Sequence, residues 1–159
     1  MLITLFTDAS HCAQTKIGAF AIWAKADGRT IRRAGLFQDR VPDSSLAETQ
    51  ALVNGLCIVL SQLTPPPGSK IIAQTDCEAA ISALTGTSRK AKSIARYAPA
   101  RAIYESRVTA AGITVEFRHV RAHKGTVTPR NAVNTWCDKA CRQWMRAGRA
   151  AATGKEQRS

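Results

Sequence analysis

The sequence predicts an α/β fold in which three antiparallel strands come first and helical crossovers then place two later strands beside the first. Three observations support this prediction. The N-terminal third contains short runs of β-forming residues separated by turn residues, a central segment repeats its leucines at helical spacing, and the second half alternates helical and strand-like stretches. Tight turns join antiparallel strands, whereas strands that alternate with helices form parallel crossovers.

The first three elements are predicted to be strands. Residues 2–7 form a short apolar run of β-formers, which is typical of a strand inside the fold. Residues 17–25 alternate as a strand does, and the turn Ala26-Asp27-Gly28 leads into a third strand near 29–37.

The segment that follows predicts one long helix. Its apolar residues recur at helical spacing, and the run Pro65-Pro66-Pro67-Gly68 ends it. Ser45, with Glu48 three residues later, matches a capping box at the start of this helix.

Two more strands and further helices are predicted after that helix. Residues 70–75 form a fourth strand, and Asp76 opens a short helix that ends near Leu84. The basic stretch 85–97 is interpreted as a loop or irregular helix, and a helix then runs from about Pro99 to Ala111.

The C-terminal part predicts one strand, one helix and a tail. Residues 113–120 form the fifth strand, and Thr128 with Pro129 caps the last helix, which carries an apolar stripe. From Gly148 on, the chain is polar and rich in small residues. We therefore expect a domain over residues 1–147 and a flexible polar tail over 148–159.

Composition favours a folded intracellular protein. The chain has 159 residues, the size of one domain, and 45% are hydrophobic. No apolar run approaches the ~20 residues of a membrane span, and the N-terminus lacks a signal-peptide layout, so we expect a cytoplasmic protein without a membrane partner. The five cysteines are odd in number and lack a C-x-x-C pair. Reduced cysteines are therefore favoured over the rival interpretation, a zinc site.

The net charge of +12 points to a polyanionic partner, and nucleic acid is the commonest one. The alternatives are a merely soluble basic protein or one that binds acidic membranes. Clustering of the cations favours a phosphate-binding surface. One cluster contains Arg89, Lys90, Lys92, Arg96, Arg101 and Arg107, and the other contains Arg118, Arg121, Lys124 and Arg130. No P-loop or dinucleotide fingerprint is present, so we expect no nucleotide cofactor.

Four carboxylates are candidates for a metal site: Asp8, Glu48, Asp76 and Asp138. The chain has only 11 acidic residues against 23 basic ones, so the placement of acidic residues at the ends of two apolar strands suggests a specific function for them. Asp8 and Asp76 would leave neighbouring strands at the same edge of the sheet. Gathered carboxylates repel one another unless a divalent cation neutralises them, and oxygen-only ligands favour Mg²⁺ or Mn²⁺.

Each of these residues also has an ordinary structural interpretation. Glu48 could serve only in the capping box, Asp76 could be a helix N-cap, and Asp138 could form a surface ion pair with Arg142. His123 could be a solvated loop residue. We favour the metal site because all the structural interpretations would have to hold at once.

Five stretches of the sequence together resemble the ribonuclease H type 1 family. They are FTDAS around Asp8, AETQAL around Glu48, QTDCEA around Asp76, VRAHKG at 120–125 and NTWCD at 134–138. The resemblance covers residues 1 to about 145. It implies a five-stranded mixed sheet with helices on both faces. The implied activity is Mg²⁺-dependent hydrolysis of the RNA strand of an RNA–DNA hybrid, which leaves 5′-phosphate products.

The resemblance also implies roles for individual residues. Asp8 would bridge two Mg²⁺ ions, with Mn²⁺ as a substitute, and Asp138 would help to hold the ion that activates water. Glu48 and Asp76 would hold the ion that faces the leaving 3′ oxygen, and His123 would assist proton transfer or product release.

Substrate contacts are expected on both sides of this site. Asn134 would touch the substrate or a nearby water, and Gln14, Ser44 and Ser45 would reach the minor groove of the hybrid. The DNA-strand phosphates would be held by Arg89, Lys90, Lys92 and Arg96. We expect a monomer. Two other functions stay open: a non-catalytic nucleic-acid-binding module, and a DNA nuclease of the junction-resolvase kind.

Overall fold

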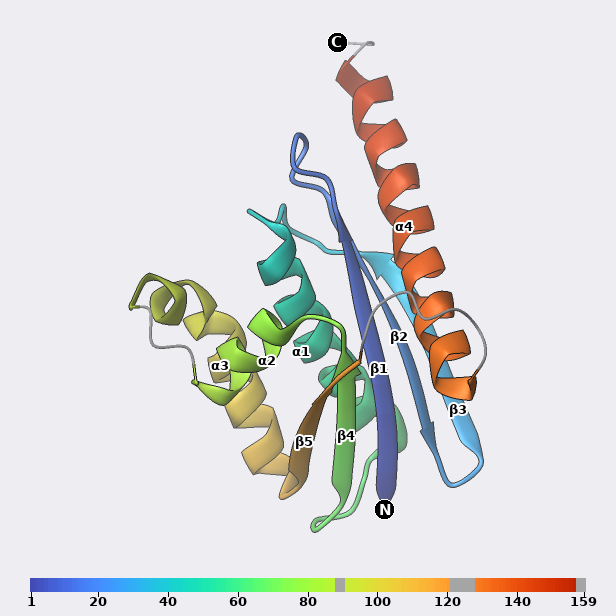
Figure 1. Cartoon of the computed structure of the whole chain (residues 1–159), viewed down its shortest axis with the longest axis vertical. Coiled ribbons are helices and arrows are strands. Elements are labelled where there is room, and N and C mark those ends of the chain that lie inside the picture. Colours follow the sequence, from blue (N-terminus) through green and yellow to red (C-terminus); the bar gives the residue numbers. More distant parts are fainter. Residues whose placement is uncertain (88–90, 121–127, 157–159) are drawn as a thin grey trace.

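The computed structural model of the chain describes residues 1–87, 91–120 and 128–156. Its elements are β1 (Leu2–His11), β2 (Gly18–Ala26), β3 (Arg29–Leu36), α1 (Ser44–Leu63), β4 (Lys70–Thr75), α2 (Glu78–Thr85), α3 (Ala91–Ala111), β5 (Thr114–His119) and α4 (Pro129–Glu156). The five strands form one mixed sheet in the order β3-β2-β1-β4-β5. Helices α1, α2 and α3 lie on one side of the sheet and α4 lies on the other (Figure 1). The predicted fold class is confirmed.

The hairpin between β2 and β3 has the turn that its sequence predicts. Ala26 pairs with Arg29, so the loop contains two residues, Asp27 and Gly28. Both have positive φ angles, 46° and 77°. A type I′ turn requires this conformation at both positions, and Asp-Gly adopts it readily.

Strand β1 is longer than predicted, and this places Asp8 within the strand. The parallel pairing of β1 with β4 ends at Phe6 and Gln74, whereas the antiparallel pairing with β2 continues to His11. Asp8 therefore lies two residues beyond the last pair with β4. Asp76 follows directly after β4. The expectation that both acids meet at one edge holds, because β1 and β4 separate there.

Helix α1 packs closely on the middle of the sheet. Its Leu52 and Leu56 are fully buried with Leu5 and Ile22 of the strands. A Cβ atom at Gly55 would lie 2.9 Å from the Cγ2 of Thr7, so only glycine permits this approach. By length and composition alone, α1 could cross a membrane, and from the sequence we expected no such stretch. Buried core helices meet the same criterion, and α1 is packed as one.

The start of α1 corrects one prediction. Asp43 is the N-cap residue, with extended backbone, and its side chain accepts a hydrogen bond of 3.0 Å from the backbone N–H of Leu46. The capping box of Ser45 and Glu48 is therefore wrong, and Glu48 is available for another role. Asp76 is not a helix cap either, because Cys77 takes the N-cap position of α2.

Two helices are longer than predicted. Helix α3 begins at Ala91, so Pro99 lies inside it rather than in its first turn. The carbonyl that Pro99 leaves without a donor belongs to Ala95, which is exposed and open to water. Helix α4 begins after the predicted Thr128 cap but continues past Gly148 to Glu156. At Gly148 a Cβ atom would lie 2.8 Å from Leu36, so this glycine serves close packing and does not end the helix.

Candidate active site

Three carboxylates from three elements meet at the edge where β1 and β4 separate. They are Asp8 of β1, Glu48 from the second turn of α1, and Asp76 after β4. One oxygen of each lies within 4.8 Å of the others. Asp8 is 7% exposed, and Asp76 and Glu48 are half-buried. The predicted convergence of these three residues is thus present in the structure.

The hydrogen bonds of this group leave negative charge unbalanced. The backbone N–H of Ala9 donates to Asp8 Oδ1 at 2.9 Å and to Glu48 Oε1 at 3.3 Å. Glu48 Oε2 is buried and has no hydrogen-bond partner among the described residues. A buried carboxylate oxygen without a partner is costly, which indicates that a proton or a cation completes the group.

The same crowding changes the acidity of two carboxyl groups. Burial, together with the charges of Asp76 and Asp138, raises the pKa of Asp8 to about 7, against the opposing effect of the Ala9 hydrogen bond. Burial also raises the pKa of Glu48 to about 9, with contributions from Asp8 and Asp76. Both effects are typical of carboxylates that share one site without a bound cation.

Asp138 lies on α4 at the border of this group. Its charge contributes to the raised pKa of Asp8, yet its Oδ1 forms an ion pair with Arg142 Nε, four residues later, at 2.7 Å. The ordinary ion pair weighed from the sequence is therefore present. It does not exclude a metal role, because only Oδ1 makes this contact and the side chain is 27% exposed.

The residues fit a divalent metal. All donors are hard carboxylate oxygens, they come from separate elements that the sheet holds in place, and one buried oxygen has no partner. This donor set suits Mg²⁺ or Mn²⁺. A zinc site would use cysteine or histidine, and neither residue type belongs to the group.

The structure also describes the smaller residues that were predicted to contact the substrate. Ser44 and Ser45 form the first residues of α1, one turn before Glu48. Gln14 lies in the turn after β1, where its Oε1 accepts a hydrogen bond of 3.2 Å from Cys12 Sγ. Asn134 is half-buried on α4, one turn before Asp138.

The predicted basic contacts are only partly visible. His123, Arg89 and Lys90 lie outside the described residues, and so does the side chain of Lys92. Arg96 forms an ion pair with Asp43, the N-cap of α1, and its guanidinium lies 5.2 Å from the ring centre of Tyr97. Arg96 thus ties α3 to the start of α1.

His119 lies beside the site, although it was not predicted as a site residue. It ends β5, where its Nε2 lies 3.0 Å from the backbone oxygen of Asp76 and its Nδ1 lies 3.6 Å from Glu78 Oε1. The strand order could have predicted this position, because β5 runs parallel to β4 and parallel strands end at the same edge of a sheet. His119 fixes the backbone of Asp76 rather than reaching the carboxylates.

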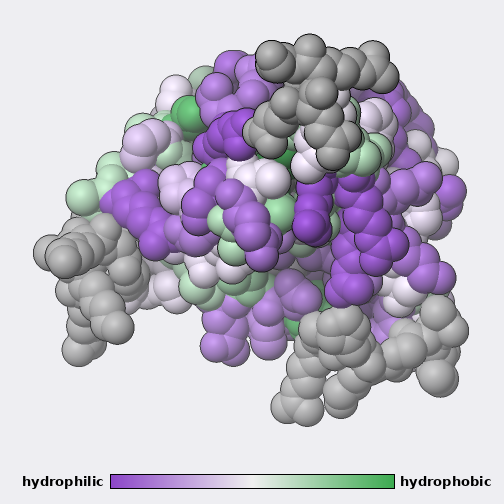
Figure 2. All heavy atoms as spheres, turned by 90° about the horizontal axis from the view of Figure 1, so that it is seen from above, coloured by the Kyte–Doolittle hydropathy of each residue, from purple (hydrophilic) through white to green (hydrophobic). Residues whose placement is uncertain are grey.

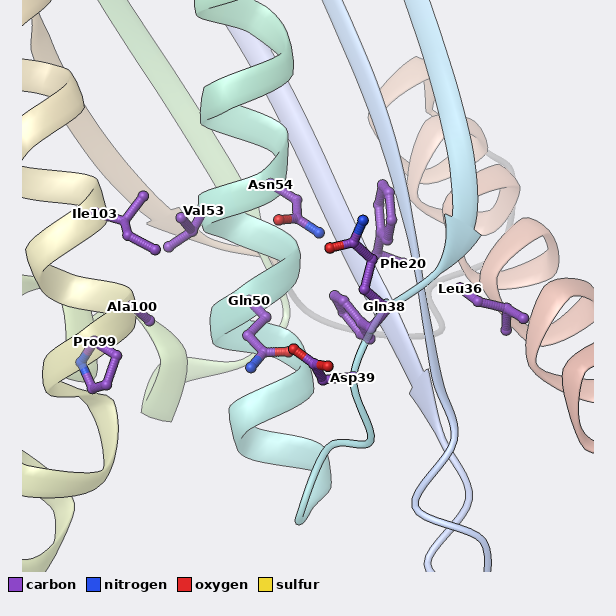
Figure 3. Close-up of a pocket in the computed structure, with 11 residues that line it drawn as sticks. Phe20, Leu36, Gln38, Asp39, Gln50, Val53, Asn54, Pro99, Ala100 and Ile103 are labelled. Atoms are coloured by element: carbon purple, nitrogen blue, oxygen red, sulfur yellow. The ribbon is translucent and has the colours of Figure 1, made fainter.

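One end of the molecule presents a largely hydrophilic surface. Figure 2 looks onto the molecule from above, and hydrophilic residues gather over much of this face. A separate cavity of about 420 Å³ is lined by residues of α1, α3 and the segment after β3; Val53 faces Ile103 there, and Gln50 lies beside Asp39 (Figure 3). None of the four carboxylates lines this cavity, so the candidate metal site lies outside it.

The comparisons with known proteins agree on one family. The family model described as RNase H matches residues 2–146. Similar solved structures include the N-terminal RNase H domain of a Mycobacterium tuberculosis protein, with 15% identity, a TM-score of 0.65, and coverage of 95% of this chain and 98% of that one. RNase H1 from the halophilic archaeon Halobacterium salinarum has 13% identity, a TM-score of 0.66, and coverage of 92% and 99%.

A third similar structure was solved with a nucleic acid. LC11-RNase H1, isolated from compost, was crystallised in complex with an RNA/DNA hybrid. It has 14% identity and a TM-score of 0.64, with 92% of this chain and 98% of that chain covered. At such identities these structures show the shared fold. No curated protein sequence matches the chain.

Proposed function

Because this chain belongs to the RNase H family, we propose that it is an endonuclease that hydrolyses the RNA strand of RNA–DNA hybrids with divalent metal ions. The observation that carries the proposal is the group formed by Asp8, Glu48 and Asp76, whose oxygens lie within 4.8 Å of one another. A module that only binds nucleic acid has no use for buried, mutually repelling carboxylates, which weaken the fold unless they hold a cation.

The charge of the chain supports a nucleic-acid substrate. The net charge is +12, although the site itself is acidic. Cations around the site would hold phosphates, and the carboxylates would hold metal ions at one phosphate. A similar structure was solved with an RNA/DNA hybrid, which supports a hybrid as the substrate here.

The role that we propose for the carboxylates follows from their positions. Asp8, Glu48 and Asp76, with Asp138 beside them, would together hold the Mg²⁺ ions. Bound there, divalent ions supply a nucleophilic water at neutral pH and stabilise the charge on the leaving oxygen. If that oxygen is the 3′ oxygen, the phosphate stays on the downstream fragment as a 5′-phosphate.

The remaining residues would orient the substrate and move protons. Gln14, Ser44 and Ser45 would bond the 2′-hydroxyl groups that distinguish RNA from DNA. Asn134, on the same helix as Asp138, would contact the substrate, and His123 would transfer a proton. The proposal also places the protein in the cytoplasm as a monomer.

Strand-labelled substrates test this function. An RNA–DNA hybrid, an RNA duplex and a DNA duplex of one sequence are incubated with Mg²⁺ or with a chelator, and the ends of the products are analysed. We expect cleavage of the RNA strand of the hybrid alone, with Mg²⁺ only. Cleavage of the DNA duplex at an equal rate would favour the resolvase-like nuclease instead.

A matched pair of variants shows whether the carboxylate site is responsible. Asp8→Asn removes one charge from the group. Asp27→Asn makes the same change in the β2–β3 turn, where asparagine tolerates the positive φ angle of 46°. Only Asp8→Asn should abolish cleavage. Loss of activity in both variants, or in neither, would contradict the proposed site.

A further inference from the structure

Four cations form a stripe along one side of α4. They are Lys139, Arg142, Arg146 and Arg149, and all four are exposed. Their spacing of three, four and three residues places them on the same side of a helix. We call this set the α4 stripe.

The stripe begins next to the carboxylate site. Asp138 immediately precedes it in sequence, and Arg142 forms an ion pair with the Asp138 carboxylate at 2.7 Å. Cys137 and Cys141 of the same helix are fully buried against the sheet, and Gly148 lies against Leu36. This packing fixes the rotation of α4, so the stripe faces outward on the side of Asp138.

The far end of the stripe lies near the turn after β1. At Gly148, the residue before Arg149, a Cβ atom would lie 3.3 Å from the Cγ2 of Ile17, and Ile17 is hydrogen-bonded to Cys12 across the turn after β1. In keeping with this, hydrogen bonds involving Thr15 and, after them, the charge of Arg149 lower the pKa of the Cys12 thiol. Arg149 is therefore close to the turn that contains Gln14. The stripe thus connects two places that the proposed function gives to the substrate.

The charge of the stripe is largely unpaired. After Asp138, no acidic residue occurs in α4 before Glu156. In the part of the chain that the structure describes, no ion pair includes Lys139, Arg146 or Arg149. Elsewhere cations do have acidic partners: Arg101 pairs with Glu105, for example. A solvated helix face normally mixes both signs, so this stripe fits a polyanion.

The shape and length of the surface suit a nucleic-acid strand. A hollow of about 360 Å³ is lined by Asp138, Lys139, Arg142, Gln143 and Arg146. From Lys139 to Arg149 the helix rises about 15 Å. One strand of a duplex presents a phosphate about every 3.4 Å along its axis, so roughly four phosphates fit beside four cations.

We propose that the α4 stripe binds the phosphates of the RNA strand that flank the cleaved phosphate. The inference rests on the proposed function, because the strand is chosen by its continuity with the metal site at Asp138. The cleaved phosphate lies at the carboxylates, and the neighbouring phosphates of the same strand then follow α4 toward the turn that contains Gln14.

The test compares two triple variants with equal loss of charge. The stripe variant replaces Lys139, Arg146 and Arg149 by glutamine and leaves Arg142, which contacts Asp138. The control variant replaces Lys25, Arg29 and Arg33 by glutamine; these residues are exposed on the β2–β3 hairpin, at the opposite end of the sheet (Figure 1). Thermal unfolding should confirm that both variants fold.

Hybrid affinity is measured by fluorescence anisotropy in chelator at several salt concentrations, so that no cleavage occurs. Each lost phosphate contact lowers the slope of log affinity against log salt by somewhat under one unit. We expect the stripe variant to lose about two units and the control variant clearly less. With Mg²⁺, the stripe variant should show a KM that rises more than kcat falls. Equal slopes for the wild type and the stripe variant would overturn the inference.

Uncharged backbone linkages, placed in one strand of the hybrid at a time, show which strand the α4 stripe contacts. Methylphosphonates beside the cleavage position in the RNA strand should weaken binding of the wild type and affect the stripe variant much less. The same result with the DNA strand instead would overturn the strand assignment. Because binding is measured without turnover, the test of the stripe is independent of the proposed hydrolysis. Even if the protein cleaves no substrate, the stripe variant can still show a smaller slope of log affinity against log salt than the wild type.

Discussion

Asp8 and Glu48 accept hydrogen bonds from one shared donor, the backbone N–H of Ala9, at 2.9 Å and 3.3 Å. One N–H cannot balance two carboxylates in a buried position. The raised pKa values of both carboxyl groups show that their ionised forms are unfavourable in the folded protein, and a bound cation would stabilise those forms. The site is thus formed by the fold before any metal arrives, at the expense of stability.

We expect the metal-free protein to lose stability at this site as the pH rises. Below pH ~4, both carboxyl groups are protonated in the folded and unfolded states. As the pH rises, the unfolded state loses these protons first, while folded Asp8 keeps its proton to about pH 7 and folded Glu48 to about pH 9. The folded state then binds more protons, so the free energy of unfolding falls over this range.

The other ionisable groups also titrate, so the measurement is a difference between proteins. The double variant Asp8→Asn/Glu48→Gln is compared with the wild type in chelator, from pH 4 to pH 9. The gain in melting temperature of the double variant should be small at pH 4 and should grow with pH. Saturating Mg²⁺ should stabilise the wild type alone. A gain that is independent of pH would contradict the shifted pKa values.

The single variant Asp8→Asn should lose turnover by at least about three orders of magnitude, because metal ions supply several kcal/mol of transition-state stabilisation. Without metal, its affinity for the hybrid should stay the same or increase, since one repelling charge near the phosphates is gone. Its melting temperature in chelator should rise. A clear fall in metal-free stability would instead identify Asp8 as a structural residue.

The sequence predicts most of the site because the site depends on strand order. Asp8 and Asp76 follow apolar strands that lie side by side in parallel, so one rule of α/β sheets brings them together. His119 obeys the same rule on β5, yet its role was missed because its contact is with the backbone of Asp76. A side chain that bonds a distant carbonyl leaves no pattern in the sequence.

Helix boundaries were less predictable, for a different reason. Three consecutive residues at the start of α1, Asp43, Ser44 and Ser45, are of types that cap helices, so the sequence alone does not identify the N-cap. Asp43 is selected as N-cap and also pairs with Arg96 of α3. Pro99 and Gly148 are typical of helix ends, but here both lie inside helices that packing extends.

Asp43 therefore has two roles that two variants can separate. Asp43→Ala removes the N-cap of α1 and the ion pair with Arg96, and should lower the free energy of unfolding by about 1–2 kcal/mol. Asp43→Asn retains the cap and loses only the half-exposed ion pair, so the loss should stay below about 1 kcal/mol. Denaturant unfolding measures both. Equal losses would mean that the ion pair, and not the cap, contributes the stability.

His123 remains a predicted catalytic residue. His123→Ala should slow turnover at saturating substrate by about one to three orders of magnitude without abolishing it, since assisted proton transfer typically contributes on that scale. The slowing should be smaller at a pH where hydroxide or buffer can replace the imidazole. Unchanged kinetics at saturating substrate would favour the alternative interpretation, in which His123 is a solvated loop residue.

The last prediction concerns the basic segment that would hold the DNA strand. Replacing Arg89, Lys90, Lys92 and Arg96 by alanine should weaken hybrid binding at moderate salt, flatten its salt dependence and raise KM. Arg96 needs separate treatment, because it pairs with Asp43 and its loss also affects the start of α1.

A triple variant that keeps Arg96 makes the result clear. If the segment contacts the DNA-strand phosphates, the triple variant should lower the slope of log affinity against log salt by about two units without lowering the melting temperature. Adding the Arg96 substitution should then reduce stability more than slope. Combining the triple variant with the α4 stripe variant should give the sum of their two slope losses, because distant sites on different strands act independently. Titrations that run parallel to the wild type would mean that the segment does not touch the phosphate backbone.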